Sequence, residues 1–147
     1  MKRVGLVIGL FVFSILCFLV AVIPVHNNKI AEDVAIEIQN IPLPKQTKQI
    51  ESISRAGKLV GNGNGMQYFG AMLIQSELTF EELEEHYSDY RKNEWTLIIE
   101  PQVGSEIKII EHEHLKFQTE PPTSNYYIIY SWGTSQGLFH ELDIRAH

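Results

Sequence analysis

Residues 66–76 read MQYFGAMLIQS, and the expected architecture is built around this stretch. It is apolar at odd and even positions alike, and Gly70 and Ala71 lie at its centre. Because successive side chains of a strand point to opposite faces, a strand that is apolar throughout has both faces buried. Small residues in the middle of a strand allow another backbone to approach closely. The stretch therefore predicts a central strand with a helix packed close to it.

The segment before this strand predicts a polar edge strand followed by a turn. QIESISRAGKLVG, at residues 49–61, mixes polar and apolar side chains as an edge strand does. GNGNG follows at residues 61–65, and Asn-Gly pairs between strands are the strongest short signal of a hairpin. A ligand-binding loop is the alternative, but a phosphate-binding loop of this kind leads into a helix N-terminus. A strand follows Gly65 instead, which favours the turn.

Residues 78–95, LTFEELEEHYSDYRKNEW, predict the amphipathic helix of the domain. Thr79 and Glu82 have the spacing of a capping box, in which each side chain bonds the backbone N–H of the other residue. Apolar side chains then recur at helical spacing on one face, at Phe80, Leu83, Tyr87 and Tyr90. We expect a helix over residues 79–92 that covers the sheet.

Four later runs predict strands: TLIIEPQ at 96–102, SEIKII at 105–110, YYIIYSW at 126–132 and LFHELDIRA at 138–146. Short connections between strands indicate antiparallel neighbours. The expected fold class is therefore α+β: a mostly antiparallel sheet of about five or six strands, in the order β-β-α-β-β-β-β, covered by one amphipathic helix.

An apolar run precedes this domain at the N-terminus. No charged residue occurs from Val4 to Val25, and these 22 positions suffice to cross a bilayer core of about 30 Å. Lys2 and Arg3 stand before the run, so the positive-inside tendency places the N-terminus in the cytoplasm and the rest of the chain outside. The sequence thus predicts a single-pass anchor in the cell membrane.

The predicted division of the chain has three parts. Residues 1–25 form a cytoplasmic stub and transmembrane anchor, 26–44 a juxtamembrane stalk, and 45–147 an extracytoplasmic α+β domain. Apolar residues alternate with polar ones over 34–38, which allows a short strand in the stalk, and the prolines at 42 and 44 end any regular element.

Two alternatives to an uncleaved anchor stay open. A cleaved signal peptide has an apolar region of about 7–15 residues and a small-x-small site, which LVAVIPVH lacks. A lipoprotein would be modified at Cys17, the only cysteine, but Leu16 stands where a small residue is expected. With one cysteine, the chain forms no intrachain disulfide and no cysteine-based metal site.

The charge of the chain excludes two kinds of partner. All 18 Asp and Glu residues and ten of the 12 Lys and Arg residues follow Arg3, which gives this part a formal net charge of −8. So acidic a domain has no electrostatic footprint for nucleic acid and no basic face for anionic lipid.

GTSQG at residues 133–137 has the G-x-S-x-G pattern of a serine-hydrolase nucleophile elbow, and Asp143 and His147 follow in triad order. A nucleophile elbow leads from a strand into a helix. The residues after Gly137 alternate with period two instead, which predicts a strand and turns Asp143 away from the core side. We interpret GTSQG as a hairpin loop, and hydrolysis at Ser135 as a remote alternative.

EHEH at residues 111–114 is the strongest metal candidate. On a strand His112 and His114 point the same way, and His140 could supply a third ligand from another predicted strand. The neighbouring apolar residues share the parity of the two glutamates, which indicates a bulge or a loop tip instead. A zinc site, a pH-responsive patch and a plain polar turn stay open, and no metal or cofactor is assigned.

The run at 126–132 gathers aromatic side chains on one face of a strand, namely Tyr126, Tyr130 and Trp132, and Ile128 shares this face. If that face lies opposite the helix, it forms an exposed platform for a partner or a glycan. The competing interpretation is core beneath the helix.

The segment GKLVGNGNGMQYFGAMLIQSELTFEELEEHYSDYRKNEW, residues 57–95, resembles a pattern of small bacterial membrane-anchored or lipoprotein-like proteins that have no known activity. In that pattern a Gly/Asn turn, a Y-F-G-A strand and a capped E-E-L helix follow one another and end near a tryptophan. The resemblance implies an envelope location and an α+β domain, and it transfers no catalytic residue.

These features together predict a single-pass envelope protein whose extracytoplasmic domain binds or scaffolds another molecule without catalysis. The expected partners are the membrane, through the N-terminal helix, and another envelope protein or a glycan. The alternative is a metal- or pH-responsive binding domain that uses His112 and His114.

Overall fold

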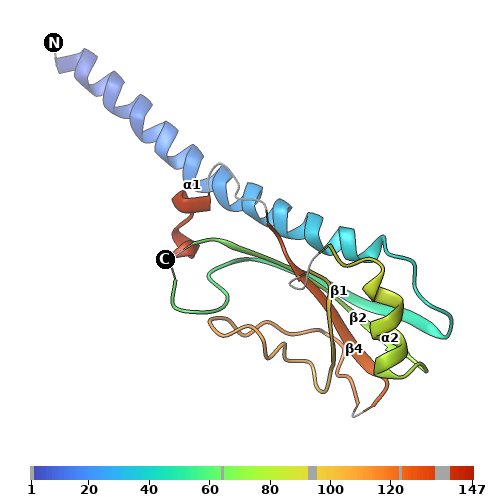
Figure 1. Ribbon diagram of the computed structural model, residues 1–147. Helices are drawn as coiled ribbons and strands as arrows, with labels where there is room; N and C mark the ends of the chain where they lie inside the picture. The colour runs from blue at the N-terminus through green and yellow to red at the C-terminus, as the bar shows by residue number, and fades with distance from the viewer. Residues whose placement is uncertain (1, 64, 93–95, 123, 135–139) are drawn as a thin grey trace.

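The computed structural model describes residues 2–63, 65–92, 96–122, 124–134 and 140–147. It contains α1 (Lys2–Gln39), β1 (Thr47–Gly57), β2 (Gln67–Ser76), α2 (Phe80–Ser88), β3 (Ile98–Pro101) and β4 (Tyr126–Trp132), followed by two 3-10 helices, η1 (His140–Leu142) and η2 (Ile144–Ala146). The strands form one antiparallel sheet in the order β1-β2-β4-β3 (Figure 1). The predicted α+β class with a long apolar N-terminal helix is confirmed, and the sheet has four strands among the described residues rather than five or six.

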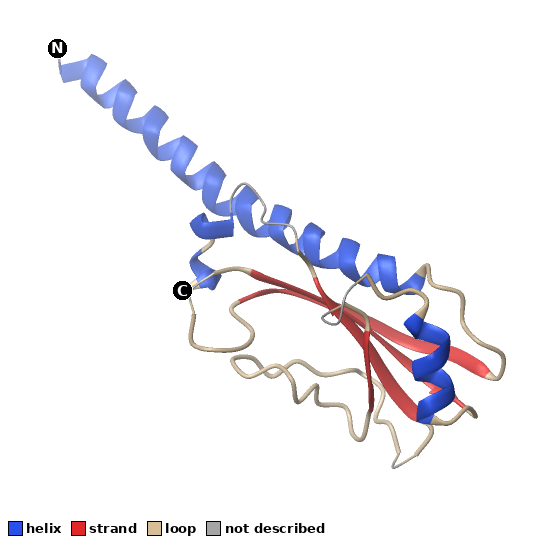
Figure 2. Cartoon of the chain, viewed as in Figure 1, coloured by secondary structure: helices blue, strands red, loops and turns tan. Residues whose placement is uncertain are grey.

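α1 is one helix with two different halves (Figure 2). From Gly5 to Val22 every side chain is exposed except that of Leu19, which is half-buried. Beyond this point one side of the helix is buried at helical spacing, at Ile23, Asn27, Ala31, Ala35 and Ile38. Residues 26–39 of the predicted stalk are therefore helix packed on the sheet, and the short strand expected over 34–38 is wrong. The helical repeat of buried positions outweighs the local alternation.

β2 is the central strand that its sequence predicts, with β1 and β4 on either side and residues 68–74 buried on both faces. A Cβ atom at Gly70 would lie 2.4 Å from the backbone nitrogen of Ala35 and 2.8 Å from its Cα. The backbone of a helix thus lies directly on the strand, which only glycine permits. The helix is α1, whereas the sequence assigned the covering role to residues 79–92.

The turn predicted at GNGNG connects β1 to β2, which form an antiparallel hairpin with β1 at the sheet edge. Gly61 and Gly65 adopt positive φ angles of 72° and 133°. Residues with side chains rarely adopt such angles, so the two glycines allow the chain to reverse here. The hairpin and the edge position of β1 are confirmed.

The capping box predicted for the second helix is present. The hydroxyl of Thr79 accepts a bond from the N–H of Glu82 at 3.3 Å, and the carboxylate of Glu82 accepts one from the N–H of Thr79 at 2.8 Å. α2 ends at Ser88, four residues before the predicted end. Leu83 and Tyr87 are buried in a cluster with residues of α1, β2, β3 and β4, so α2 covers the β3 end of the face on which α1 also lies (Figure 1).

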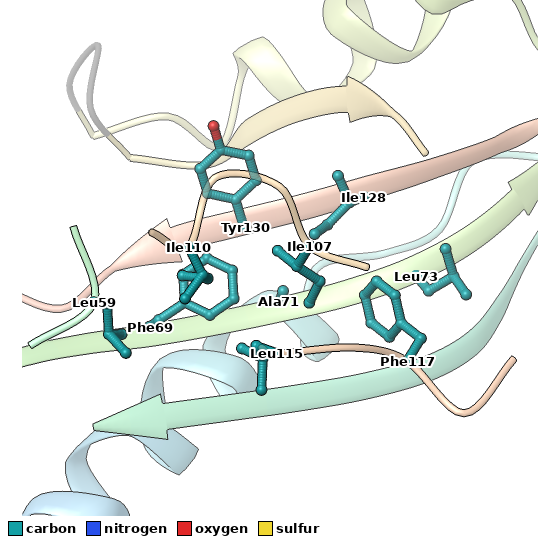
Figure 3. Packing of buried hydrophobic residues seen from close by; sticks show 10 residues of the cluster. All are labelled: Leu59, Phe69, Ala71, Leu73, Ile107, Ile110, Leu115, Phe117, Ile128 and Tyr130. Atoms are coloured by element: carbon teal, nitrogen blue, oxygen red, sulfur yellow. The ribbon is translucent and has the colours of Figure 1, made fainter. Parts of the chain in front are cut away.

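The other face of the sheet is covered by the long β3–β4 connection instead of a helix. Its buried side chains Ile107, Ile110, Leu115 and Phe117 pack on Phe69 and its neighbours (Figure 3). The strand expected at 105–110 is wrong, because Ile110 N–H donates to the carbonyl of Ile107 at 3.2 Å and the chain turns there. An isolated bridge between Glu106 and Lys116 is the β-type pairing that it makes.

The last predicted strand, over 138–146, is also wrong where the structure describes it. Residues 140–142 and 144–146 form the short helices η1 and η2. The expected burial is inverted at three positions, where Asp143 is buried and Leu142 and Ile144 are exposed, and the buried residues 143 and 146 are three apart rather than two. The inversion follows from the bonds that Asp143 makes to α1 and to Arg145, which are described below.

Candidate functional site

A groove of about 690 Å³ lies between the second half of α1 and the end of β4. Its walls come from three segments far apart in the sequence: residues 30–41 at the end of α1 and just after it, described residues between Tyr90 and Leu97, and residues 131–134 at the end of β4 and just after it. The close approach of α1 to the sheet at Gly70 and Gly133 sets the position of the α1 wall. The groove is therefore a product of tertiary packing and of no single motif.

The groove combines apolar and polar surface. Ile38 and Leu97 are 2% and 4% exposed and contribute apolar surface. Asp33 and Glu37 line the α1 side, and both carboxylates have cationic partners: Lys29 at 3.0 Å from Asp33, and Lys92 at 3.6 Å from Glu37. Apolar surface with a few polar groups at its edge is typical of a binding site.

The polar side chains of this lining carry hydroxyl, carboxylate, amide and ammonium groups. Of the described residues that line the groove, none is His or Cys, and the hydroxyl groups belong to Tyr90, Thr96, Ser131 and Thr134. The groove can hold a ligand by shape and hydrogen bonding.

A second polar site joins the C-terminal tail to α1, and we name its four residues Asn27, Tyr68, Asp143 and Arg145 the C-terminal clasp. The Asp143 carboxylate accepts bonds from Asn27 Nδ2 at 2.9 Å and from Arg145 Nε and Nη2 at 2.9 and 2.7 Å. The Tyr68 hydroxyl donates to Asn27 Oδ1 at 3.0 Å. Asn27 and Asp143 are 0% and 1% exposed, so the clasp is a buried polar network with its bonds satisfied.

Hydrogen bonding from Arg145 lowers the pKa of Asp143 from 3.8 to about 2, and a weaker contribution from Asn27 acts in the same direction. Burial alone would raise this pKa, so the bonds outweigh the loss of solvation. Asp143 is a carboxylate whose oxygens are occupied by donors, and it is unsuited to accept a proton in catalysis near neutral pH.

The structure describes two members of the apparent triad, Asp143 and His147. Asp143 lies toward the interior and serves the clasp, contrary to the expectation that it faces away from the core side. His147 is exposed, and its Nε2 lies 3.1 Å from the carbonyl of Glu141. Ser135 and the rest of residues 135–139 lie outside the described residues. The downstream 3-10 helices of three residues each are also shorter than the helix that a nucleophile elbow leads into.

EHEH is a loop that docks on the GNGNG turn. Glu111 Oε2 accepts from the N–H of Gly61 at 2.8 Å, and His112 Nε2 lies 2.7 Å from the carbonyl of the same glycine. Glu113 forms an ion pair with Arg55 of β1. His114 is 98% exposed in its side chain, with Nδ1 3.4 Å from Glu106. The loop geometry agrees with the loop-tip interpretation, and the turn at 61–65 is held by this loop.

These contacts give the metal hypothesis no support. His112 contacts the carbonyl of Gly61 and His114 contacts Glu106, so the two have separate partners. Nε2 of His140 on η1 lies 3.8 Å from Oε1 of Glu141. In the part of the chain that the structure describes, no group of three His, Cys, Asp or Glu side chains could hold a metal ion. Zinc or proton binding at His112 and His114 stays a prediction.

The aromatic face of β4 lies opposite the helices, yet the β3–β4 connection covers it. Ile128 and Tyr130 are 2% and 5% exposed, and the half-buried Trp132 ring stacks on Phe69 at 5.0 Å. Tyr130 donates to Glu100 Oε1 at 2.9 Å, and burial together with this bond raises the pKa of Tyr130. The face is core, although the cover is a loop segment and not the helix that the sequence suggested.

The residues that build the groove and the clasp were missed at the level of sequence, although a signal was present. Ile30, Ala31, Val34, Ala35 and Ile38 recur at i, i+1, i+4, i+5 and i+8. That spacing marks one face of a helix, and two of its members are small enough for close packing. Asn27 gave no such signal, because its partner Asp143 is 116 residues away.

No model of a known protein family, no curated protein and no solved structure matches the chain. The resemblance of residues 57–95 to small membrane-anchored proteins therefore stays a prediction.

Proposed function

We propose that the chain is a single-pass membrane protein whose α+β domain is held at the membrane surface and binds another molecule without catalysis. The observation that carries the proposal is the double character of α1. Its first half is long and apolar enough to cross a membrane, and its second half is a buried part of the domain. Anchor and domain share one helix, so the position of the domain relative to the membrane is fixed by packing.

Exposed apolar surface supports the anchoring part of the proposal. Large hydrophobic side chains from Leu6 to Val20, apart from the half-buried Leu19, are 43–66% exposed. A water-exposed helix with such a surface would associate or aggregate, because continuous apolar patches of this size are rare on monomeric soluble proteins. A lipid environment removes this cost, and the helix tolerates that environment because its backbone N–H and C=O groups bond to one another.

The groove supports the binding part. It has an apolar lining with polar groups at its edge. The net charge of −8 after Arg3 favours a neutral or basic ligand over nucleic acid or anionic lipid. Another envelope protein or a glycan satisfies this requirement, and the bacterial envelope location remains an expectation from the resemblance.

Alkaline extraction tests the anchor. Membranes from cells that make the full chain should retain it, whereas the double variant Phe13→Arg/Leu16→Arg should pass into the supernatant, because each buried arginine costs about 2.5–3.5 kcal/mol at the centre of a span. Val103→Arg is the matched control, since Val103 is also apolar and exposed but lies on the β3–β4 connection. Release of the unaltered chain by alkali would contradict the anchor.

Cysteine labelling tests the orientation. In a Cys17→Ser background, an impermeant maleimide should label Glu77→Cys in intact cells, because Glu77 is exposed on the domain. Labelling that requires lysis of the cells would place the domain in the cytoplasm.

Photo-crosslinking tests the groove. A photoreactive amino acid in place of Asn40, which lines the groove, should give a discrete product in native membranes, and Thr134→Trp should suppress this product by narrowing the groove. The same probe at Val103 is the control. Identical products from both positions would contradict a role for the groove.

An activity screen tests the absence of catalysis. Turnover of a hydrolase or transferase substrate by the purified full chain would contradict a non-catalytic function.

A further inference from the structure

The C-terminal tail exposes apolar side chains at an unusual place. Leu142 and Ile144 are 62% and 79% exposed, and Ile144 has the highest exposure among the large hydrophobic residues whose exposure is known. Asp143 between them is 1% exposed. At residues 142–144 the tail is thus inverted: the charged Asp143 is buried and the apolar residues on either side are exposed, the opposite of what water favours.

The clasp fixes the position of this tail along the axis of α1. Arg145 Nη2 donates to the carbonyl of Pro24 at 3.2 Å, and Arg145 Nη1 donates to Asn28 Oδ1 at 2.8 Å. The contacts lie within one helical turn of Val25, where the apolar run ends. η1 and η2 sit against α1 where its two halves meet (Figure 1).

This position coincides with the membrane interface if α1 spans the bilayer. The 22 apolar positions of α1 extend about 33 Å at about 1.5 Å per residue, which matches a hydrocarbon core of about 30 Å. The next turn of the helix then lies in the headgroup layer. The clasp, and with it Leu142 and Ile144, is held in that layer.

The charges around the tail are consistent with a neutral interface. Asp143 is neutralised by Arg145 at 2.7 Å, and Lys29 is paired with Glu32 and Asp33 at 3.1 and 3.0 Å. Glu141 is the exposed acidic side chain of the tail. Since no unpaired cation among these residues would attract anionic lipid, burial of the two apolar side chains provides the attraction.

We propose that the C-terminal tail is a second membrane contact, in which Leu142 and Ile144 insert at the boundary between the headgroups and the acyl chains beside the point where α1 leaves the bilayer. The proposal rests on the proposed function, because it requires α1 to span. Its structural basis is the exposure of the two side chains on a tail that Arg145 bonds to Pro24 and Asn28, where the apolar run of α1 ends. The clasp then acts as the device that presents them to the lipid.

Depth-dependent fluorescence quenching tests the contact in nanodiscs of phosphatidylcholine that each carry one copy of the full chain. An environment-sensitive fluorophore is attached to Leu142→Cys or Ile144→Cys in a Cys17→Ser background. Lipids with a spin label close to the headgroup serve as the shallow quencher, and lipids labelled near the chain end serve as the deep quencher. Val103→Cys is the matched control, and the native Cys17, labelled in the unaltered chain, reports insertion of α1.

We expect blue-shifted emission and stronger quenching by the shallow label at both tail positions, deep quenching at Cys17, and neither effect at Val103→Cys. Deep quenching at Cys17 with water-like emission at both tail positions would overturn the tail contact and leave the anchor intact. Loss of quenching at Cys17 as well would overturn the proposed function itself. Shielding of the tail that occurs in vesicles with many copies but not in single-copy nanodiscs would show that a second copy covers it, and would also overturn the proposal.

Discussion

The substitution Gly70→Ala tests the contact on which the fold depends. The added Cβ would lie 2.4 Å from Ala35 N, 2.8 Å from Ala35 Cα and 2.8 Å from Val34 C. Carbon atoms in contact are usually about 3.5–4.0 Å apart, so α1 would have to retreat by about 1 Å. All three atoms belong to the backbone, and no side-chain rotation can relieve the overlap.

The expected cost follows from this geometry. Overpacking by one methyl group costs about 1–3 kcal/mol, and a rigid backbone places this site at the upper end. A gap of about 1 Å beside the methyl group also forfeits up to about half of the dispersion energy of nearby contacts. The loss of chain freedom in the unfolded state returns only about 0.4–1 kcal/mol. We therefore expect the free energy of unfolding to fall by about 2–3 kcal/mol.

Urea unfolding of the full chain in detergent micelles, followed by tryptophan fluorescence, measures this change. With an m-value of about 2 kcal/mol per molar, the midpoint should fall by about 1–1.5 M. Gly63→Ala is the matched control, because its Cβ would meet nothing within 4 Å and its φ is not in the positive region. A Gly70→Ala midpoint equal to that of Gly63→Ala would refute the close contact between α1 and β2.

Substitutions at four other positions give sharp expectations for the same chain. Tyr87→Phe should leave the free energy of unfolding unchanged or raise it by up to about 1 kcal/mol, because the buried Tyr87 hydroxyl has no hydrogen-bond partner among the described residues. Tyr130→Phe should lower the free energy of unfolding by about 1–2 kcal/mol, because the Tyr130 hydroxyl donates to Glu100. Equal urea midpoints for the two variants would contradict this difference between the two hydroxyls. Thr79→Ala should lower it by about 1 kcal/mol through loss of the α2 cap while Thr79→Ser should not, as thermal unfolding can measure. The pKa of Asp143 is about 2 in the folded chain and 3.8 ordinarily, so its carboxylate stabilises the folded chain above pH 3.8, and this contribution of about 2 kcal/mol is lost as the pH falls to about 2. Asp143→Asn should lack that loss. If the free energy of unfolding depended on pH in the same way in both chains, the clasp would be contradicted.

Several elements could be predicted because their signals are local. The capping box of α2 involves residues three positions apart, and the Asn-Gly turn requires positive φ angles that glycine adopts freely. β2 was predicted as central for the same reason, because a strand that is buried on both faces is apolar at odd and even positions alike. In each case the residue pattern and the structure that it causes occupy the same short segment.

The errors share a different cause. Residues 105–110 and 138–146 have strand-like composition, but each found partners elsewhere: the first turns at Ile110 to cover Phe69, and the second folds into 3-10 turns around the bonds of Asp143. Residues 34–38 alternate as a strand does, yet the longer helical repeat that buries Ala31 and Ala35 prevailed. Tertiary contacts overrode local preference in all three segments.

By itself the sequence determined the apolar N-terminal helix, the α+β class, the hairpin, the central strand and the capped helix, since each depends on hydrophobic period or on backbone requirements within one segment. The tertiary structure alone decided that α1 continues past Val25 onto the sheet, that its approach at Gly70 helps to form the groove, and that the tail closes on Asn27. The physical reason is that these outcomes depend on which distant surfaces fit together. Asn27 and Asp143 are 116 positions apart, and only the folded chain brings a buried amide to a buried carboxylate.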